Sequence, residues 1–185
     1  AIRASQLGMK VAVVEKAELG GVCLNWGCIP TKALLKSANV FEYFKHASDY
    51  GIEAKDFKAD LSGMVKRSRD VAAGMSKGVQ FLLKKNKIEQ LLGYGKLKKG
   101  GKVEVTDAAG KKTDYEAKNI IVATGGRSRE LPSMKIDGKK IIGYREAMIL
   151  DKQPKKLLVV GSGAIGVEFA YFYNSIGTEV TIVEF

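Results

Sequence analysis

Apolar and polar residues recur along the chain in patterns that predict both strands and helices. The apolar run at residues 10–16 (KVAVVEK) is typical of a buried parallel strand, and the residues before Gly8 predict the end of a helix. Apolar side chains recur every three or four positions over residues 31–47 and again over residues 60–86. This spacing predicts two amphipathic helices, the second of which is long.

The middle of the chain is rich in strand patterns. Four strands are predicted there, over residues 88–97, 102–107, 112–118 and 119–126, with a turn at residues 107–112. Residues 156–163 (KLLVVGSG) then predict a strand and a glycine-rich turn, followed by a helix over residues 164–176 and a strand at 179–185. These signals predict an α/β fold with two Rossmann-like nucleotide-binding modules, both incomplete, and a β-rich connection.

Composition limits the class of protein. Of the 185 residues, 45% are hydrophobic and 28% are charged, which is typical of a globular chain rather than a disordered one. No apolar run approaches the ~18 residues of a membrane span, and the chain does not begin with a secretory signal. Because it lacks an initiating Met, begins part-way through a predicted helix and ends after a predicted strand, we interpret it as a fragment.

The net charge of +11 invites comparison with nucleic-acid-binding proteins. The positive residues are scattered between predicted elements, without an aromatic platform, in residues 84–87, 96–102, 110–112 and 155–157. Nucleic-acid interfaces gather basic side chains on one face instead. We therefore interpret the charge as a solvated surface and expect neither a nucleic acid nor a membrane as a partner.

The glycines of GSGAIG follow a predicted strand and open a predicted helix, which is the context that a G-x-G-x-x-G sequence needs. Gly161 would permit a tight turn, Gly163 would let the backbone approach a pyrophosphate, and Gly166 would let helix and strand pack closely. Glu184 lies at the end of the next strand, where a carboxylate binds a ribose 2′-hydroxyl and repels a 2′-phosphate. The pattern predicts a site for NAD(H) rather than NADP(H), with an unrelated glycine-rich turn as the alternative.

Both cysteines, Cys23 and Cys28, lie in GGVCLNWGCIPTKALL at residues 20–35. They could be metal ligands, inert core thiols or a redox-active pair, and a single distant histidine makes a zinc site the least favoured. On a regular helix their Cα atoms would be roughly 8–9 Å apart, whereas a disulfide needs less than about 7 Å. Gly27 can supply the distortion and Lys32 favours a thiolate, so a redox-active pair fits best.

The order of these motifs resembles the flavin-dependent pyridine nucleotide-disulfide oxidoreductases over the whole chain. The matching sequences are the strand ending at Glu15, the cysteine segment, GYGK, VATGGR, GSGAIGVEFA and VTIVEF. CLNWGCIPTKALL together with Glu184 most resembles the branch of the family that oxidises dihydrolipoamide with NAD+. Branches that act on glutathione or on a mercuric ion are the nearer alternative.

The resemblance implies a role for each matching residue. Cys23 would meet the substrate, Cys28 would lie beside the flavin, and Lys32 would lie near flavin N5. The implied FAD ligands are Glu15, Lys16, Gly20, Gly21, Val22, Cys23, Lys32, Gly95, Thr124, Gly125 and Gly126. The implied NAD ligands are Gly161, Ser162, Gly163, Ala164, Ile165, Gly166, Val167, Glu168 and Glu184.

Lys32 and Glu168 are far apart in the sequence, yet the resemblance implies that they form an ion pair. We expect Lys32 to be buried and therefore to require the carboxylate of Glu168. Two unrelated surface charges are the alternative. No metal ligand is expected, and His46, near a predicted helix end, is interpreted as structural or exposed.

The resemblance also implies how the whole protein is organised. Residues 1–145 would be part of an FAD-binding domain that lacks its first strand and G-x-G-x-x-G. Residues 146–185 would be the first β-α-β unit of an NAD-binding domain. The interface domain, which makes the homodimer and carries a His–Glu pair, would be missing. By itself, such a fragment is expected to be inactive, to bind FAD poorly and to aggregate.

The implied activity is reoxidation of dihydrolipoamide through a Cys–Cys disulfide and FAD, with hydride passed to NAD+. The implied partners are a second copy of the protein and the lipoyl domain of a 2-oxo-acid dehydrogenase or glycine-cleavage complex. The implied location is the cytoplasm or, in a eukaryote, the mitochondrial matrix. The alternative from a different class is a non-catalytic, basic nucleotide-binding module.

Overall fold

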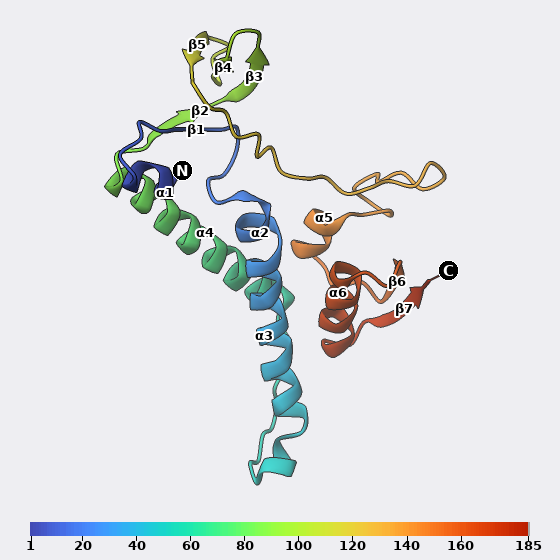
Figure 1. Ribbon diagram of the computed structural model, residues 1–185. Coiled ribbons are helices and arrows are strands. Elements are labelled where there is room, and N and C mark those ends of the chain that lie inside the picture. Colours follow the sequence, from blue (N-terminus) through green and yellow to red (C-terminus); the bar gives the residue numbers. More distant parts are fainter. Residues whose placement is uncertain (185) are drawn as a thin grey trace. The chain divides into compact units, whose positions relative to one another are not determined.

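The computed structural model describes residues 1–184 as an α/β chain whose contacts divide it into two compact units (Figure 1). The first unit comprises Ala1–Gly21 and Gly74–Gly126, and the second comprises Val22–Ala73 and Arg127–Phe185. Helix α4 (Leu61–Lys85) contributes to both units. Each unit has a hydrophobic core of its own.

The first unit contains a pair of parallel strands, β1 (Ala12–Glu15) and β2 (Glu89–Leu92). Helix α1 (Ile2–Gln6) precedes β1, and the chain leaves it through Gly8, whose φ of 84° is left-handed. The strand and the helix end predicted for the start of the chain are both confirmed. The buried core of this unit consists of Leu19, Leu83 and Ile88, with Ile2, Val11, Val13 and Val79 packed against them.

Three antiparallel strands follow in the order β3 (Tyr94–Lys98), β4 (Lys102–Thr106) and β5 (Lys112–Glu116). The predicted turn between β4 and β5 is confirmed: the side chain of Asp107 accepts hydrogen bonds from two backbone N–H groups of the turn. Across β3 and β4, the Lys98 ammonium lies 2.7 Å from the Glu104 carboxylate. This hydrogen bond raises the pKa of Lys98 and lowers the pKa of Glu104.

The strand predicted over residues 119–126 is wrong. Only β1 to β7 are formed among residues 1–184, and residues 119–126 belong to no strand or helix. Ile121 is 87% exposed and Val122 is 64% exposed. An apolar run becomes a strand only where a neighbouring strand satisfies its backbone N–H and C=O groups, and none of the described strands pairs with this segment.

Helices dominate the second unit. They are α2 (Gly21–Trp26), α3 (Cys28–Lys45), the 3₁₀ helix η1 (Ala47–Tyr50), the first half of α4, α5 (Tyr144–Met148) and α6 (Ala164–Ser175). The helices predicted over residues 31–47, 60–86 and 164–176 are thereby confirmed. Their shared core contains Leu34, Ala38, Leu61, Met148, Phe169, Phe172, Tyr173 and Ile176. Burial also raises the pKa of Tyr173, whose hydroxyl donates a hydrogen bond to the carbonyl of Ala147.

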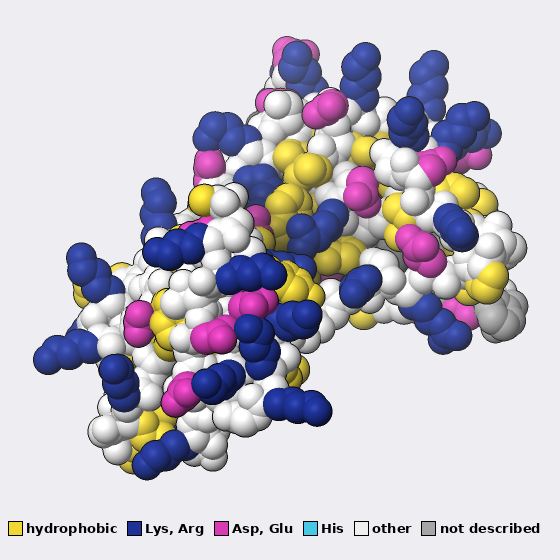
Figure 2. Space-filling view, turned by 90° about the horizontal axis from the view of Figure 1, so that it is seen from above, with side chains coloured by type: hydrophobic (Ala, Val, Ile, Leu, Met, Phe, Trp, Pro, Cys, Tyr) yellow, Lys and Arg dark blue, Asp and Glu magenta, His cyan; other side chains and the backbone are white. Residues whose placement is uncertain are grey.

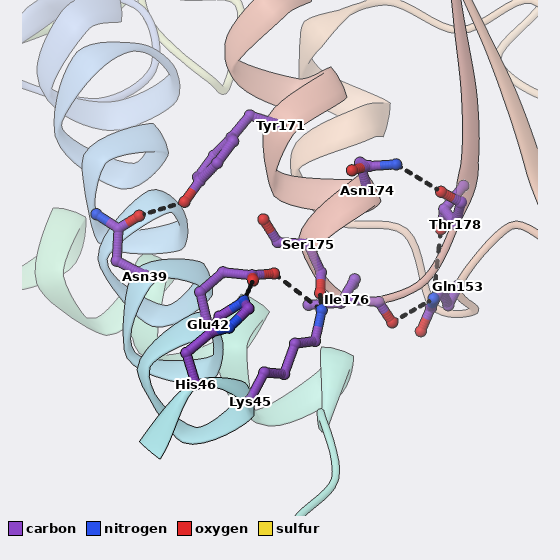
Figure 3. Close-up of polar contacts among 10 residues, drawn as sticks. All are labelled: Asn39, Glu42, Lys45, His46, Gln153, Tyr171, Asn174, Ser175, Ile176 and Thr178. Atoms are coloured by element: carbon purple, nitrogen blue, oxygen red, sulfur yellow. Dashed lines mark hydrogen bonds and ion pairs between the residues drawn. The ribbon is translucent and has the colours of Figure 1, made fainter. Parts of the chain in front are cut away.

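The second unit ends in the predicted β-α-β element. Strands β6 (Lys156–Val160) and β7 (Glu179–Val183) are parallel, and α6 connects them. The turn from α6 into β7 is fixed by Gln153, which donates hydrogen bonds to the carbonyl of Ile176 at 2.9 Å and to the hydroxyl of Thr178 at 3.3 Å (Figure 3).

Helix α3 lies against α6, and polar contacts fix their relative position (Figure 3). The Tyr171 hydroxyl donates a hydrogen bond of 2.6 Å to Asn39. One and a half turns further along α3, the Lys45 ammonium donates a hydrogen bond of 2.5 Å to the carbonyl of Ser175, at the end of α6. The helix that begins at Cys28 is therefore held in register with the helix that follows the glycine-rich turn.

Lys and Arg side chains are spread over the face shown in Figure 2, with Asp and Glu side chains among them. This distribution is consistent with the interpretation of the charge as a solvated surface. Among residues 1–184, the structure has no helix that combines the length and the hydrophobicity needed to cross a bilayer.

Candidate active site

A disulfide between Cys23 and Cys28 lies where two helices meet. Helix α2 ends at Trp26, α3 begins at Cys28, and Gly27 between them leaves the helical conformation with φ −136° and ψ −120°. The break brings the Cα atoms of the two cysteines to 4.9 Å. The expectation that the backbone is distorted at Gly27 is confirmed, because an unbroken helix would hold these atoms too far apart.

Glycine is needed at position 27 because neighbouring backbone atoms lie too close for a side chain. Its φ of −136° is not left-handed, so the backbone conformation alone does not call for glycine. A Cβ atom added there would lie 2.9 Å from the Cα of Cys23 and 3.1 Å from the carbonyl oxygen of Val22. Both neighbours are backbone atoms, which cannot rotate away. The absence of a side chain at Gly27 therefore lets the chain fold back far enough for the disulfide to close.

Both cysteines are exposed residues. Their surroundings differ, because Cys28 is the first residue of the 18-residue helix α3 whereas Cys23 lies inside the short α2. The positive end of a helix dipole stabilises an anion at the helix start. A thiolate is therefore better stabilised on Cys28 than on Cys23 once the bond between them is reduced.

Lys32, one turn after Cys28, forms an ion pair with Glu168 of α6. The structure thus brings together the two charges that the sequence separates. The Lys32 side chain is 61% exposed and that of Glu168 is 29% exposed, so the expected burial of Lys32 is wrong. More than half of the Lys32 side chain is therefore in contact with solvent even though its ammonium group is paired.

Trp26, between the two cysteines, has partners that the sequence did not reveal. The guanidinium groups of Arg69 on α4 and Arg145 on α5 lie 3.9 Å and 4.8 Å from the centre of its ring. No local pattern announces such contacts, because the three residues come from distant parts of the chain. The residues between the cysteines are nevertheless held by two further helices.

The glycine-rich turn between β6 and α6 has the backbone that a dinucleotide site requires. Gly161 adopts a left-handed φ of 99°. A Cβ atom on Gly166 would lie 2.9 Å from Cγ1 of Val159 on β6, so Gly166 lets α6 pack against the strand. A Cβ atom on Gly163 would meet nothing within 4 Å, which leaves open space at the N-terminus of α6. This geometry fits a pyrophosphate at the helix start.

The remaining residues assigned to this site surround the same helix start. Ala164, Ile165 and Val167 lie in the first turn of α6, where Ile165 and Val167 are exposed apolar side chains. Glu184 directly follows β7, and its carboxylate accepts a hydrogen bond from the backbone N–H of Ser162. The carboxylate at the strand end therefore lies beside the glycine-rich turn.

The residues assigned to FAD in the first unit lie at the carboxyl end of β1 and after it. Glu15 ends β1 and accepts a hydrogen bond of 2.8 Å from the N–H of Ala17. Gly20 and Gly21 both adopt left-handed φ angles, of 112° and 76°. The end of a parallel strand is the edge at which such folds bind nucleotides, so these residues fit one side of a dinucleotide site.

Gly95 lies on β3, close to β1. A Cβ atom there would be 3.1 Å from Cγ1 of Val14, so this glycine serves the packing of the two strands. The other assigned residues of the first unit are Lys16, Thr124, Gly125 and Gly126, which are all exposed. The last three lie in the segment 119–126, which is not a strand, so they are not fixed by a sheet.

The structure thus combines a disulfide at the start of α3 with a β-α-β element whose helix packs against α3. The chain belongs to the pyridine nucleotide-disulphide oxidoreductase family, whose model matches residues 1–185.

Similar proteins have related names. The chain is 53% identical over 184 residues to the dihydrolipoyl dehydrogenase of Chlorobaculum parvum, covering 100% of the chain and 39% of that protein. It is 43% identical over 187 residues to the leghemoglobin reductase of Vigna unguiculata, covering 100% of the chain and 36% of that protein. A crystal structure of LpdA from Mycobacterium tuberculosis superposes with a TM-score of 0.89 at 29% identity, over 98% of the chain and 40% of that protein. The chain thus spans well under half the length of these relatives.

Proposed function

We propose that the protein of which this chain is a part is a dihydrolipoyl dehydrogenase, which oxidises the dithiol of dihydrolipoamide and passes two electrons to NAD+. The observation that carries the proposal is the Cys23–Cys28 disulfide, closed across Gly27 on a helix that packs against α6. Relatives named dihydrolipoyl dehydrogenase, at 50% to 54% identity over the whole chain, support the choice of substrate.

The chain's own residues carry the first half of this reaction by thiol–disulfide exchange. A substrate thiolate attacks the sulfur of Cys23, forms a mixed disulfide and releases the thiolate of Cys28, which the start of α3 stabilises. The second thiol of the substrate then loses its proton and attacks the first sulfur of the substrate, which is bonded to Cys23. This attack releases the thiolate of Cys23. Two electrons and two protons leave the substrate, the lipoyl disulfide is formed, and the pair on the enzyme becomes a dithiol.

When bound, FAD supplies the redox group that accepts electrons from this dithiol and donates them to NAD+. We assign Cys28 and Lys32 to the flavin side of the site. The other residues assigned to FAD are Glu15, Lys16, Gly20, Gly21, Val22, Cys23, Gly95, Thr124, Gly125 and Gly126. We assign NAD to the turn and helix start at Gly161, Ser162, Gly163, Ala164, Ile165, Gly166, Val167, Glu168 and Glu184.

This assignment implies a division of the chain into two domains and a set of partners. We infer that residues 1–145 belong to an FAD-binding domain and residues 146–185 to an NAD-binding domain. The partners we propose are a second copy of the protein and the lipoyl domain of a 2-oxo-acid dehydrogenase or glycine-cleavage complex. We propose the cytoplasm or the mitochondrial matrix as its location, the second because three relatives are named mitochondrial enzymes.

The decisive test is NADH formation by the full-length protein with free dihydrolipoamide as the reductant. We expect turnover with dihydrolipoamide and NAD+, and little with glutathione or with NADP+. Preferential turnover of glutathione would instead favour another branch of the family. A protein without flavin absorbance and without dithiol oxidation would show that the proposal is wrong.

Two glycine substitutions separate binding from folding in the NAD site. Gly163→Ala places its methyl group in open space, so the free energy of unfolding should change by less than about 0.5 kcal/mol. The KM for NAD+ should nevertheless rise about tenfold, because the methyl group meets the approaching pyrophosphate. Gly166→Ala should impair both properties, since its methyl group lies against Val159. Steady-state kinetics and thermal melting of the full-length variants distinguish the two; an unchanged KM in Gly163→Ala would contradict the assignment.

Removing the charge of Glu168 should slow reduction of the flavin by NADH. Glu168→Gln leaves Lys32 without its ionic partner, so the ammonium is no longer held at one position. We expect a decrease of about tenfold, which corresponds to roughly 1.4 kcal/mol of lost stabilisation. Stopped-flow absorbance of the full-length protein measures the rate. Glu42→Gln is the matched control, because Glu42 also pairs with a lysine, Lys45, but at the far end of α3; equal rates in both variants would remove the role of Glu168.

A further inference from the structure

Two arginines hold the residues between the cysteines. The guanidinium carbon of Arg69 lies 3.9 Å from the centre of the Trp26 ring, and that of Arg145 lies 4.8 Å from it. These are cation–π distances. Trp26 is the last residue of α2 and precedes Gly27, so it lies inside the loop that the disulfide closes.

Arg69 makes a second contact with the same loop. Its Nη1 donates a hydrogen bond of 2.6 Å to the carbonyl oxygen of Asn25, and Nη1 also lies 3.5 Å from the sulfur of Met148. Asn25 is only 4% exposed and Met148 only 1% exposed. One planar guanidinium therefore contacts the ring of Trp26 and the backbone of Asn25 while resting on the core of the second unit. Such a combination suits arginine and not lysine, whose ammonium is not planar.

We infer that Arg69 is a positioning residue that keeps Cys23 and Cys28 close together after their disulfide is reduced. The inference rests on the proposed function only in taking this disulfide to be one that opens and closes. The contacts of Arg69 with the Asn25 carbonyl and the Trp26 ring involve no sulfur atom of the disulfide, so these two contacts do not depend on the bond between the cysteines. They therefore remain available when that bond is broken.

Such a restraint changes the equilibrium between the dithiol and disulfide forms of Cys23 and Cys28. Forming the bond from two thiols on one chain is favoured in proportion to their effective concentration, which is the probability that they meet. Without the bond, Gly27 provides a point at which α2 and α3 can separate. Contacts that fix Asn25 and Trp26 limit this movement. Arg69 is thus expected to make the disulfide harder to reduce.

The charge of Arg69 acts in the opposite direction, because a cation near the cysteines favours thiolates and hence the reduced form. The substitution Arg69→Lys separates the two effects. It keeps the positive charge and removes the planar group that contacts Trp26 and Asn25 together. A change in the equilibrium in this variant therefore reports on position rather than on charge.

The matched control is Arg67→Lys. Arg67 lies on the same helix and also donates a hydrogen bond to a backbone carbonyl, that of Ala33 at 2.8 Å. Its contacts are with α3 after the disulfide loop, including Ser37 at 3.4 Å. The control loses a comparable arginine–carbonyl contact and leaves Asn25 and Trp26 untouched.

The experiment titrates the full-length protein with mixtures of reduced and oxidised dithiothreitol. Reduction of the protein disulfide consumes the two thiols of one dithiothreitol molecule, which becomes its cyclic disulfide. Alkylation of Cys23 and Cys28 followed by mass spectrometry gives the fraction reduced, without dihydrolipoamide or NAD+. The result is therefore independent of which substrate and nucleotide the enzyme uses.

We expect Arg69→Lys to shift the equilibrium about tenfold toward the dithiol, which is ~30 mV for a two-electron couple. Arg67→Lys should remain within about twofold of the unchanged protein. If Arg69→Lys does not fold, Trp26→Phe, which keeps an aromatic ring but weakens the cation contact, should shift the equilibrium in the same direction by a smaller factor. An unchanged equilibrium in the variant that folds, or a shift toward the disulfide, would overturn the inference.

Discussion

Replacing Cys28 with serine is expected to lower NADH formation from dihydrolipoamide on the order of 10³-fold or more in the full-length protein. A serine hydroxyl cannot form the bond to Cys23 that accepts the two electrons of the substrate. The variant also loses the thiolate that the start of α3 stabilises as leaving group. A substrate thiol then has no disulfide to attack, and the exchange cannot begin.

The measurement is steady-state NADH absorbance, with thermal melting to show that the variant is folded. Cys23→Ser should lose as much activity, because either change removes the same bond. Ser37→Ala is a suitable control: Ser37 lies on α3, and its hydroxyl donates a hydrogen bond to the carbonyl of Ala33 at 3.2 Å and accepts one from Arg67 at 3.4 Å, neither of which involves the disulfide. The exchange mechanism would be wrong if either cysteine variant kept more than a tenth of the activity of the Ser37→Ala protein.

The disulfide was accessible to prediction from the sequence because its constraint is local. Helix geometry alone shows that Cys23 and Cys28 cannot meet without a break, and Gly27 lies at the break in the structure. The β-α-β element at the end of the chain was equally predictable, since strand, turn and helix signals follow one another directly. In both cases the determining residues are neighbours along the chain.

Features that depend on distant partners were not accessible in this way. The ion pair of Lys32 with Glu168 was expected only through a family resemblance, and the degree of burial of Lys32 was wrong even then. The contacts of Trp26 with two arginines were missed, because a cation–π pair leaves no spacing pattern in the sequence. Residues 119–126 have the composition of a strand, but strand formation requires a pairing partner that composition cannot supply.

Helix α5 shows a third case, in which a signal was present but weak. Glu146 accepts a hydrogen bond of 2.9 Å from the backbone N–H of Gly143, the residue before the helix. A Glu three residues after a helix-capping position is a recognised start signal. Here the capping residue is glycine, which provides no side-chain oxygen, and the helix has only five residues. The pattern was therefore too short to be distinguished from a turn.

The substitution Gly27→Ala is expected to destabilise the oxidised protein by about 1–3 kcal/mol, the usual cost of overpacking. The added methyl group would lie 2.9 Å from the Cα of Cys23, and a backbone atom cannot move aside without opening the loop. Reduction of the disulfide removes the bond that enforces this approach. The penalty should therefore be smaller in the reduced protein, and the variant's disulfide should be reduced about tenfold or more readily.

The matched control is Gly74→Ala, because Gly74 lies within α4 and a Cβ atom there meets nothing within 4 Å. Alanine is favoured over glycine inside a helix by up to ~1 kcal/mol, so this change should stabilise the protein in both redox states. Denaturant unfolding with and without dithiothreitol gives the free energies of unfolding of the unchanged protein and of both variants in each redox state. If Gly27→Ala destabilised the oxidised and reduced forms equally, the close approach at Gly27 would be a general packing constraint, and its link to closure of the disulfide would have to be abandoned.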